Sequence, residues 1–186
     1  MDARNQRLVN AATVVFQRYG VSKTTMNDIA REAGVARQTL YNAYPSKEAI
    51  LRAAVRKGNA ATVDEVTRIW AEQDSFADKL ETFFTLGPIS WYDTVQASPE
   101  AADLIDGMHS IASEEMLEAH AGWTALFSAQ IAAHAAAGSP AAQNTKATAD
   151  FVFSTSANAK YDAPDRDTFL TRLRILKTAV LGMMDA

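Results

Sequence analysis

The stretch TTMNDIAREAGVARQTLYNAYPSKEAIL, residues 24–51, decides the fold of the first part of the chain. Thr25 can cap a helix because its hydroxyl can accept a hydrogen bond from a first-turn N–H, and Asp28 suits the positive end of the helix dipole. Apolar side chains then recur at spacings of three and four along one stripe, from Met26 through Ile29 to Ala33. Gly34 ends this helix, since such a turn commonly needs a residue that accepts positive φ.

A second short helix is predicted from about Arg37 to Tyr44. Its spacing turns Leu40, Tyr41 and Tyr44 inward and leaves four polar side chains outward, those of Arg37, Gln38, Thr39 and Asn42. Pro45 disfavours helical geometry in the residue before it, and Ser46 can cap the helix that follows. Two short helices joined by a glycine turn, the second with a donor-rich outer face, indicate a helix-turn-helix.

The segment DIAREAGVARQTLYNAYPSKEAIL resembles the DNA-binding signature of TetR-type transcriptional repressors, and the match covers roughly the first third of the chain. The residues at the expected offsets are Ile29, Ala30, Gly34, Val35, Thr39, Leu40, Tyr41, Tyr44, Ser46, Lys47 and Glu48. Ala43 departs from the pattern, because family members usually carry there a Tyr or His that contacts phosphate. The resemblance implies a repressor that a small-molecule inducer releases from a palindromic operator.

The expected fold is all-α, with an N-terminal three-helix helix-turn-helix domain at residues 1–50 and a helical ligand-binding and dimerisation domain at 51–186. The N-terminal domain is called the head below. Its first helix is predicted from about Arg4 to Tyr19, by apolar residues at helical spacing. A helix from Ser46 to about Glu72 would connect the two domains, with a kink or break at Gly58 left open.

Outward polar side chains of the second short helix suit base recognition, although a solvated helix face is the plain alternative. Arg can bridge guanine O6 and N7, Gln or Asn can pair with adenine N6 and N7, and the Thr methyl can touch thymine. The resemblance places four further residues at positions that hold phosphates or the core of the head, namely Thr25, Tyr41, Tyr44 and Lys47. Of these, Tyr41 is expected to reach a phosphate, and Tyr44 to be packed with its oxygen at the rim.

Composition bounds the class of protein. The 186 residues are 48% hydrophobic and 22% charged, as in soluble globular proteins, and the absence of Cys excludes disulfides and fits a cytoplasmic location. Neither the N-terminus nor the uncharged stretch 119–145, which contains many polar residues, predicts a signal peptide or a membrane span. Residues 1–58 carry a net charge of +6 and the remainder −10, which suits a DNA-binding head on a separate acidic body.

The body is expected to be helical throughout, without strand-like alternation. From Ser75, one helix is predicted to end near Gly87-Pro88, and others to start at Ser98-Pro99-Glu100, at Ser113 and at Ser139-Pro140. The Ala-rich segment 120–138 is apolar on most sides and should be the central helix. The last two helices, about 143–160 and 165–184, follow a short connection and should be antiparallel.

The resemblance implies a homodimer through these last two helices, and the pairing of the two helices predicts that Phe169 or Leu173 is buried between the subunits. It also implies a small-molecule effector of unknown identity. The candidate ligand residues are Trp91, Met108, His109, Met116, His120, Trp123 and Phe127, with Tyr92 and Gln130 near them in sequence. Aromatic and Met side chains with a few polar groups suit an apolar pocket, but they are equally the content of a helical core.

Metal and cofactor sites are not expected. His120 and His134 are fourteen residues apart, about 21 Å along one helix, and no HxxxH or HExxH motif occurs. An enzyme is the competing class, yet the chain has no nucleophile elbow, phosphate loop or GxGxxG. Two alternatives stay open: a helical small-molecule-binding protein or enzyme whose helix-turn-helix is not used for sequence-specific regulation, and an architectural DNA-binding protein.

Overall fold

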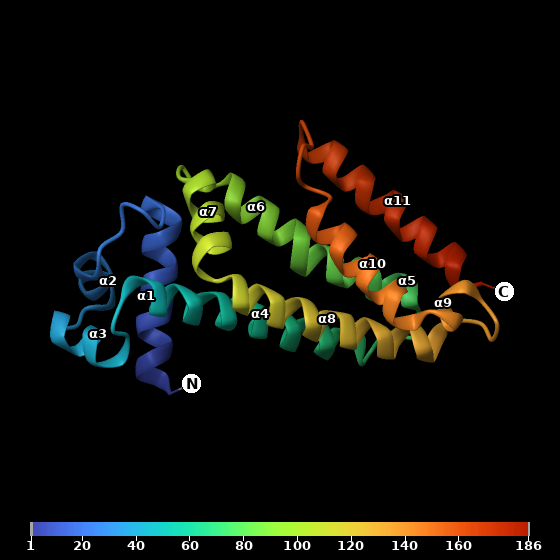
Figure 1. Ribbon diagram of the computed structural model, residues 1–186, viewed down its shortest axis with the longest axis horizontal. Helices are drawn as coiled ribbons and strands as arrows, with labels where there is room; N and C mark the ends of the chain where they lie inside the picture. Colours follow the sequence, from blue (N-terminus) through green and yellow to red (C-terminus); the bar gives the residue numbers. More distant parts are fainter. Residues whose placement is uncertain (1, 186) are drawn as a thin grey trace. The chain divides into compact units, whose positions relative to one another are not determined.

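The computed structural model describes residues 2–185, and within them every regular element is helical (Figure 1). The helices are α1 (Ala3–Tyr19), α2 (Met26–Ala33), α3 (Arg37–Ala43), α4 (Lys47–Trp70), α5 (Phe76–Phe84), the π-helical η1 (Thr85–Ile89), α6 (Ser90–Gln96), α7 (Ala101–Ile111), α8 (Ser113–His134), α9 (Pro140–Gln143), α10 (Thr145–Asn158) and α11 (Arg166–Met184). The predicted all-α class is confirmed. In this described part, no helix is both long and apolar enough to cross a membrane.

Two compact units divide the chain. Unit 1 combines the residues up to Ala61 with Asp93–Leu117, and unit 2 combines Thr62–Tyr92 with the residues from Glu118 on. Both α4 and α8 begin in unit 1 and end in unit 2. The compact units therefore group α7 with α1–α3, which a division of the chain after residue 50 does not. The division into a DNA-binding domain at residues 1–50 and a ligand-binding and dimerisation domain at 51–186 stays a prediction.

In unit 1, the helix-turn-helix forms as local sequence predicts. Thr25 and Asp28 make a capping box at the start of α2, and Gly34 adopts the left-handed conformation, with φ of 63°, at its end. The apolar stripe of α2 is buried, and so is Leu40 of α3. The buried face of α1, from Leu8 to Phe16, completes this core.

Unit 2 is built around an apolar core to which α4, α5, α8, α10 and α11 contribute. Aromatic rings form its centre, where Phe83 lies with ring centroids 4.8 Å from both Trp123 and Phe127. Phe153 of α10 stacks on Trp123. The helix α8, predicted to be central in the body, supplies Trp123, Phe127 and Ile131 to this core.

The predicted helix end at Gly87-Pro88 is wrong. Helical structure continues through both residues, because the chain widens into the π-helical turn η1, and the Ser90 N–H donates to the carbonyls of Thr85 and Gly87. Pro88 has no N–H to donate, and a single π turn accommodates that loss without ending the helix. At Gly58 the assigned helix α4 is uninterrupted.

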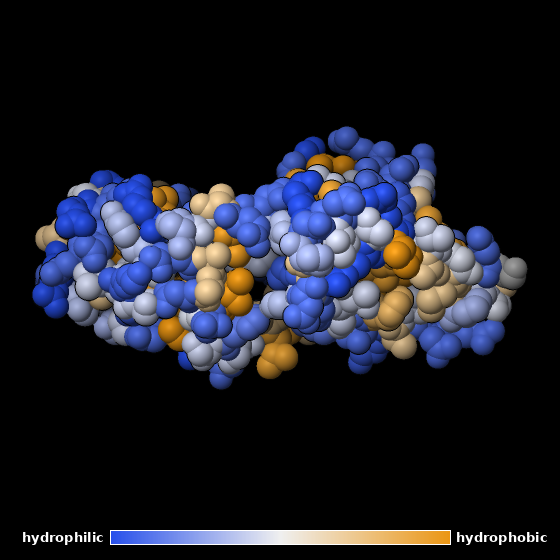
Figure 2. All heavy atoms as spheres, turned by 90° about the horizontal axis from the view of Figure 1, so that it is seen from above, coloured by the Kyte–Doolittle hydropathy of each residue, from blue (hydrophilic) through white to orange (hydrophobic). Residues whose placement is uncertain are grey.

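Phe169 and Leu173 were predicted to lie between subunits, and this prediction is also wrong. Their exposed fractions are 0% and 2%, and both belong to the core of unit 2. The large apolar side chains that α10 and α11 expose are instead Phe151, at 42%, and Ile175, at 64%. On the face shown in Figure 2, hydrophilic residues cover most of the surface and hydrophobic ones gather in smaller patches.

Candidate DNA-binding surface and effector site

The outward face of α3 carries two side-chain pairs, each one helical turn long. Arg37 Nη2 donates to the Tyr41 hydroxyl at 3.2 Å, and the guanidinium lies 5.1 Å from the centroid of the Tyr41 ring. Gln38 Nε2 donates to Asn42 Oδ1 at 2.8 Å. Arg37, Gln38 and Asn42 are exposed and Tyr41 is half-buried. The structure therefore brings four of the predicted DNA-contact residues together on one face.

The other predicted DNA-contact residues lie around this face in different roles. Thr25 caps α2 through its hydroxyl, which also bonds Asp28 at 2.6 Å. Thr39 and Tyr44 are half-buried, and burial raises the pKa of the Tyr44 hydroxyl. Lys47, the first residue of α4, donates to the carbonyls of Val21 at 2.7 Å and Ser22 at 3.2 Å. Contact of Lys47 with phosphate stays a prediction.

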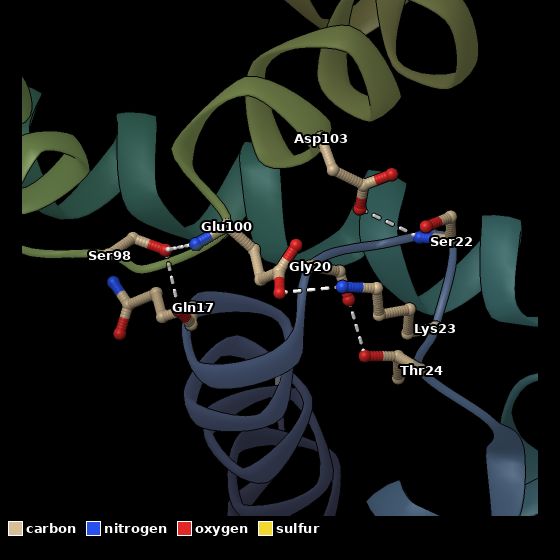
Figure 3. A network of polar contacts seen from close by, with 8 residues as sticks. All are labelled: Gln17, Gly20, Ser22, Lys23, Thr24, Ser98, Glu100 and Asp103. Carbon is tan, nitrogen blue, oxygen red and sulfur yellow. Dashed lines mark hydrogen bonds and ion pairs between the residues drawn. The ribbon is translucent and has the colours of Figure 1, made fainter.

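Sequence reasoning missed a polar network between the α1–α2 loop and the start of α7 (Figure 3). The Ser22 N–H donates to Asp103 Oδ2 at 2.9 Å, and Lys23 Nζ pairs with Glu100 Oε1 at 2.7 Å. The Ser98 hydroxyl donates to the Gln17 carbonyl at 2.6 Å and accepts from the Glu100 N–H. The hydrogen bond from Ser22 holds the pKa of the Asp103 carboxyl below its ordinary value.

This network corrects one sequence prediction. Ser98 does not cap the helix, since α7 begins at Ala101 after Glu100 at its N-cap. Its hydroxyl is used instead to join this segment to the end of α1. Partners about eighty residues apart leave no periodicity or spacing in the sequence, so no local signal could have revealed these contacts.

The predicted ligand residues are divided between the two units. Met108, His109 and Met116 belong to unit 1, where His109 is exposed. The remaining four belong to unit 2, namely Trp91, His120, Trp123 and Phe127. Of these, Trp123 and Phe127 are buried in the aromatic core, with exposed fractions of 3% and 0%. Trp123 and Phe127 are therefore packed as core residues, which is one of the two alternatives that the sequence allowed.

Two surface hollows of unit 2 are lined by other residues. The larger, of about 540 Å³, is lined by Thr124, Gln143, Asn144, Thr145, Lys146, Ala147 and Asp150. The smaller, of about 330 Å³, is lined by Ile69, Gln73, Asp78, Glu81, Thr82, Thr85 and Leu86. His120 reaches the larger hollow indirectly, because its Nε2 lies 2.6 Å from Oδ1 of Asp150. Between residues 2 and 185, no three His, Asp or Glu side chains are grouped to hold a metal ion.

Comparison with known proteins shows what the N-terminal part of the chain is similar to. Residues 8–54 match the family described as "Bacterial regulatory proteins, tetR family". The "Uncharacterized HTH-type transcriptional regulator YfiR" of Bacillus subtilis is 28% identical over 107 residues, which are 52% of this chain and 52% of YfiR. The chain thus spans about half the length of this curated relative.

Solved structures share the whole fold at low sequence identity. The fatty acid degradation regulator FadR from Bacillus halodurans superposes with a TM-score of 0.71 at 16% identity, over 97% of this chain and 96% of its own. FadR of Thermus thermophilus, a TetR-family transcriptional repressor solved in complex with lauroyl-CoA, gives a TM-score of 0.59 at 21% identity, over 96% and 94%. At these identities the likeness concerns the fold alone.

Proposed function

Because residues 8–54 match the family of TetR-type bacterial regulatory proteins, we propose that the chain is a DNA-binding transcriptional regulator that acts as a repressor. The observation that carries the proposal is the outward face of α3, where donors and acceptors stand in ordered pairs. The net charge of +6 over residues 1–58 adds attraction to the phosphate backbone.

The pair of Gln38 and Asn42 suits adenine. One hydrogen bond between two amides uses one N–H and one carbonyl oxygen, so a carbonyl oxygen and N–H groups remain free to face outward. If the side-chain amides of Gln38 and Asn42 are both turned over, so that oxygen and nitrogen change places, one carbonyl oxygen and N–H groups still remain free. Adenine offers an N–H₂ donor and the N7 acceptor in the major groove, whereas guanine offers two acceptors.

The pair of Arg37 and Tyr41 suits phosphate. The Tyr41 hydroxyl accepts from Arg37, so its own proton is free, and the guanidinium has further N–H groups. This pair therefore presents donors, which suit phosphate oxygens as well as the two acceptors of guanine. We assign Arg37 and Tyr41 to backbone contact and Gln38 with Asn42 to base reading.

We also propose a homodimer formed through α10 and α11, whose outward faces are unburied in the single chain. Along α11 the exposed positions Ile175, Thr178, Ala179 and Gly182 follow one stripe. The small side chains after Ile175 would let a second helix approach closely. Two heads about 34–36 Å apart could then engage successive major grooves of a palindrome.

A small-molecule effector acting on unit 2 completes the proposal. The aromatic core contains Trp123 and Phe127, and an apolar or weakly polar molecule would lodge there by displacing such side chains. The lauroyl-CoA found in the Thermus thermophilus regulator makes acyl-CoA the first class to test. Because α4 and α8 run from unit 2 into unit 1, a change in unit 2 can reach the head through continuous helices. The effector would shift the population toward dimers whose heads do not fit the operator.

Selection of duplexes from a random library by the full-length protein tests the first step. We expect a palindromic site that is bound at least about 1000-fold more tightly than random duplex. The selected duplex is then titrated in the presence of acyl-CoAs of increasing chain length, with free CoA as the control. If an effector lowers the affinity for DNA, linkage requires that DNA lower the affinity for the effector by the same factor. Selection of no consensus would overturn the regulatory function.

A further inference from the structure

The loop from Gly20 to Thr24, which leads from α1 into the helix-turn-helix, is held from two directions within unit 1. From α4, Lys47 Nζ binds the carbonyls of Val21 and Ser22. From α7 and the residue before it, Asp103 accepts the Ser22 N–H and Glu100 pairs with Lys23 (Figure 3). The loop is also closed on itself, because the Thr24 hydroxyl donates to the Gly20 carbonyl at 2.5 Å. Thr25, the cap of α2, follows directly.

Steric fit makes this contact specific. Val21 is 3% exposed, and a Cβ added to Gly107 of α7 would lie 2.7 Å from the Val21 Cβ. Non-bonded carbon atoms pack at about 3.5–4.0 Å, so the loop and α7 approach here only because residue 107 is glycine. On the other side, Gly20 has a φ of 76°, and a Cβ there would strike the Asp103 carboxylate. The loop and α7 therefore pack closely because residues 20 and 107 are glycines and the Asp103 carboxylate lies against Gly20.

We propose that Asp103 and Gly107 are positioning residues for DNA binding: they hold the Gly20–Thr24 loop and thereby set how α2 and α3 are presented to the DNA. Neither residue contacts the outward face of α3 through any of the interactions described. Their effect runs through Ser22 and Val21 to the capped start of α2. This inference rests on the proposed function and names a control element for the same DNA-binding surface.

The substitution Gly107→Ala separates positioning from stability. Alanine is the stronger helix former, so this change favours α7 itself while its methyl group pushes α7 away from Val21. Gly58→Ala is the matched control, because it gives α4 the same gain in helix propensity with no other group within 4 Å of the added Cβ. A second pair is Asp103→Ala against Asp103→Asn, since the amide oxygen of Asn can still accept from Ser22.

Each variant is measured for affinity to the duplex that the wild type selects, for the salt dependence of binding and for hydrogen exchange at the Ser22 amide. We expect Gly107→Ala and Asp103→Ala to bind at least about fivefold more weakly, the lower end of typical coupling between separate sites. Their Ser22 amides should exchange faster, and the slope of log affinity on log salt should stay unchanged because the phosphate contacts remain. Gly58→Ala and Asp103→Asn should resemble the wild type in all three measurements.

Wild-type affinity in both Gly107→Ala and Asp103→Ala would overturn the inference. So would an affinity loss that follows the melting temperature across all four variants, because that result describes a stability effect only. If Gly107→Ala does not fold, Asp103→Ala against Asp103→Asn decides the matter alone. Selection of no duplex by the wild type would instead overturn the proposed function, and that result is known before any variant is made.

Discussion

Trp70 and Lys79 exchange hydrogen bonds between the last residue of α4 and the helix α5. Trp70 Nε1 donates to the Lys79 carbonyl and Lys79 Nζ donates to the Trp70 carbonyl, both at 2.8 Å. The exposed fractions are only 2% and 7%. An ammonium at this position suits the negative end of α4, and it adds a second donor to the Trp70 carbonyl, which also accepts from the Gln73 N–H at 3.3 Å.

Lys79→Met should lower the free energy of unfolding by about 1 kcal/mol. Loss of a hydrogen bond from a charged donor costs about 1.5–3 kcal/mol, and relief from burying the cation offsets part of this cost; the Trp70 carbonyl keeps the Gln73 N–H at 3.3 Å. Lys177→Met is the matched control, because it breaks only the solvent-accessible ion pair with Glu81 and should change stability less. Urea unfolding of both variants provides the comparison, and equal losses would show that the buried bond adds nothing.

Gln38→Ala should relax selection at one adenine of each half-site and cost about 1–3 kcal/mol on the selected duplex. Binding to random duplex should barely change, since phosphate contacts dominate there. Tyr41→Phe is the contrasting variant, because loss of its hydroxyl should weaken both duplexes alike. Repeating the duplex selection with each variant shows directly whether the selected consensus sequence changes. An unchanged consensus for Gln38→Ala would remove Gln38 from base reading.

Lys47→Ala should act on both stability and DNA binding. It removes the donor to the Val21 and Ser22 carbonyls, for a loss of about 1 kcal/mol. It also removes one cation near the DNA, which should flatten the slope of log affinity on log salt by about one unit. Thermal unfolding and salt titrations separate the two effects. A variant with wild-type salt dependence would restrict Lys47 to holding the loop.

Ile175→Glu should separate a dimer while the fold of each protomer persists. Ile175 is 64% exposed in the single chain, so a charge there is harmful only where a second subunit covers it. Phe169→Ala is the opposite case, because loss of a fully buried ring should lower the free energy of unfolding by about 3–5 kcal/mol. Light scattering with circular dichroism distinguishes them. A stable Ile175→Glu dimer would place the interface elsewhere.

Acid should weaken the start of α2. The hydrogen bonds from Thr25 hold the pKa of the Asp28 carboxyl below its ordinary value. A carboxyl whose folded pKa is depressed stabilises the fold above its unfolded pKa of about 3.9, and this contribution is lost as pH falls through the folded value. The melting temperature of Asp28→Asn should therefore be lower than that of the wild type at pH 7, with the gap narrowing near pH 3. A gap that is independent of pH would contradict this role.

Local chemistry made the helix-turn-helix predictable. The cap at Thr25, the glycine turn at Gly34 and the i, i+4 spacing of Gln38 and Asn42 all act within a few residues, so the sequence alone determined them. Helix starts at Ser113 and Pro140 were read in the same way. Pro88 was misread because whether a proline ends a helix depends on how the neighbouring backbone re-bonds around it.

Only the tertiary structure decided which faces meet. Phe169 and Leu173 have the apolar spacing of an interface, but the same spacing serves a core, and packing placed them inside their own subunit. The contacts of the Asp103 carboxylate and Gly107 could not be predicted from the sequence, because their partners Ser22 and Val21 are about eighty residues away. Periodicity shows which side of a helix is buried, and contacts between distant segments arise only when the folded chain brings them together.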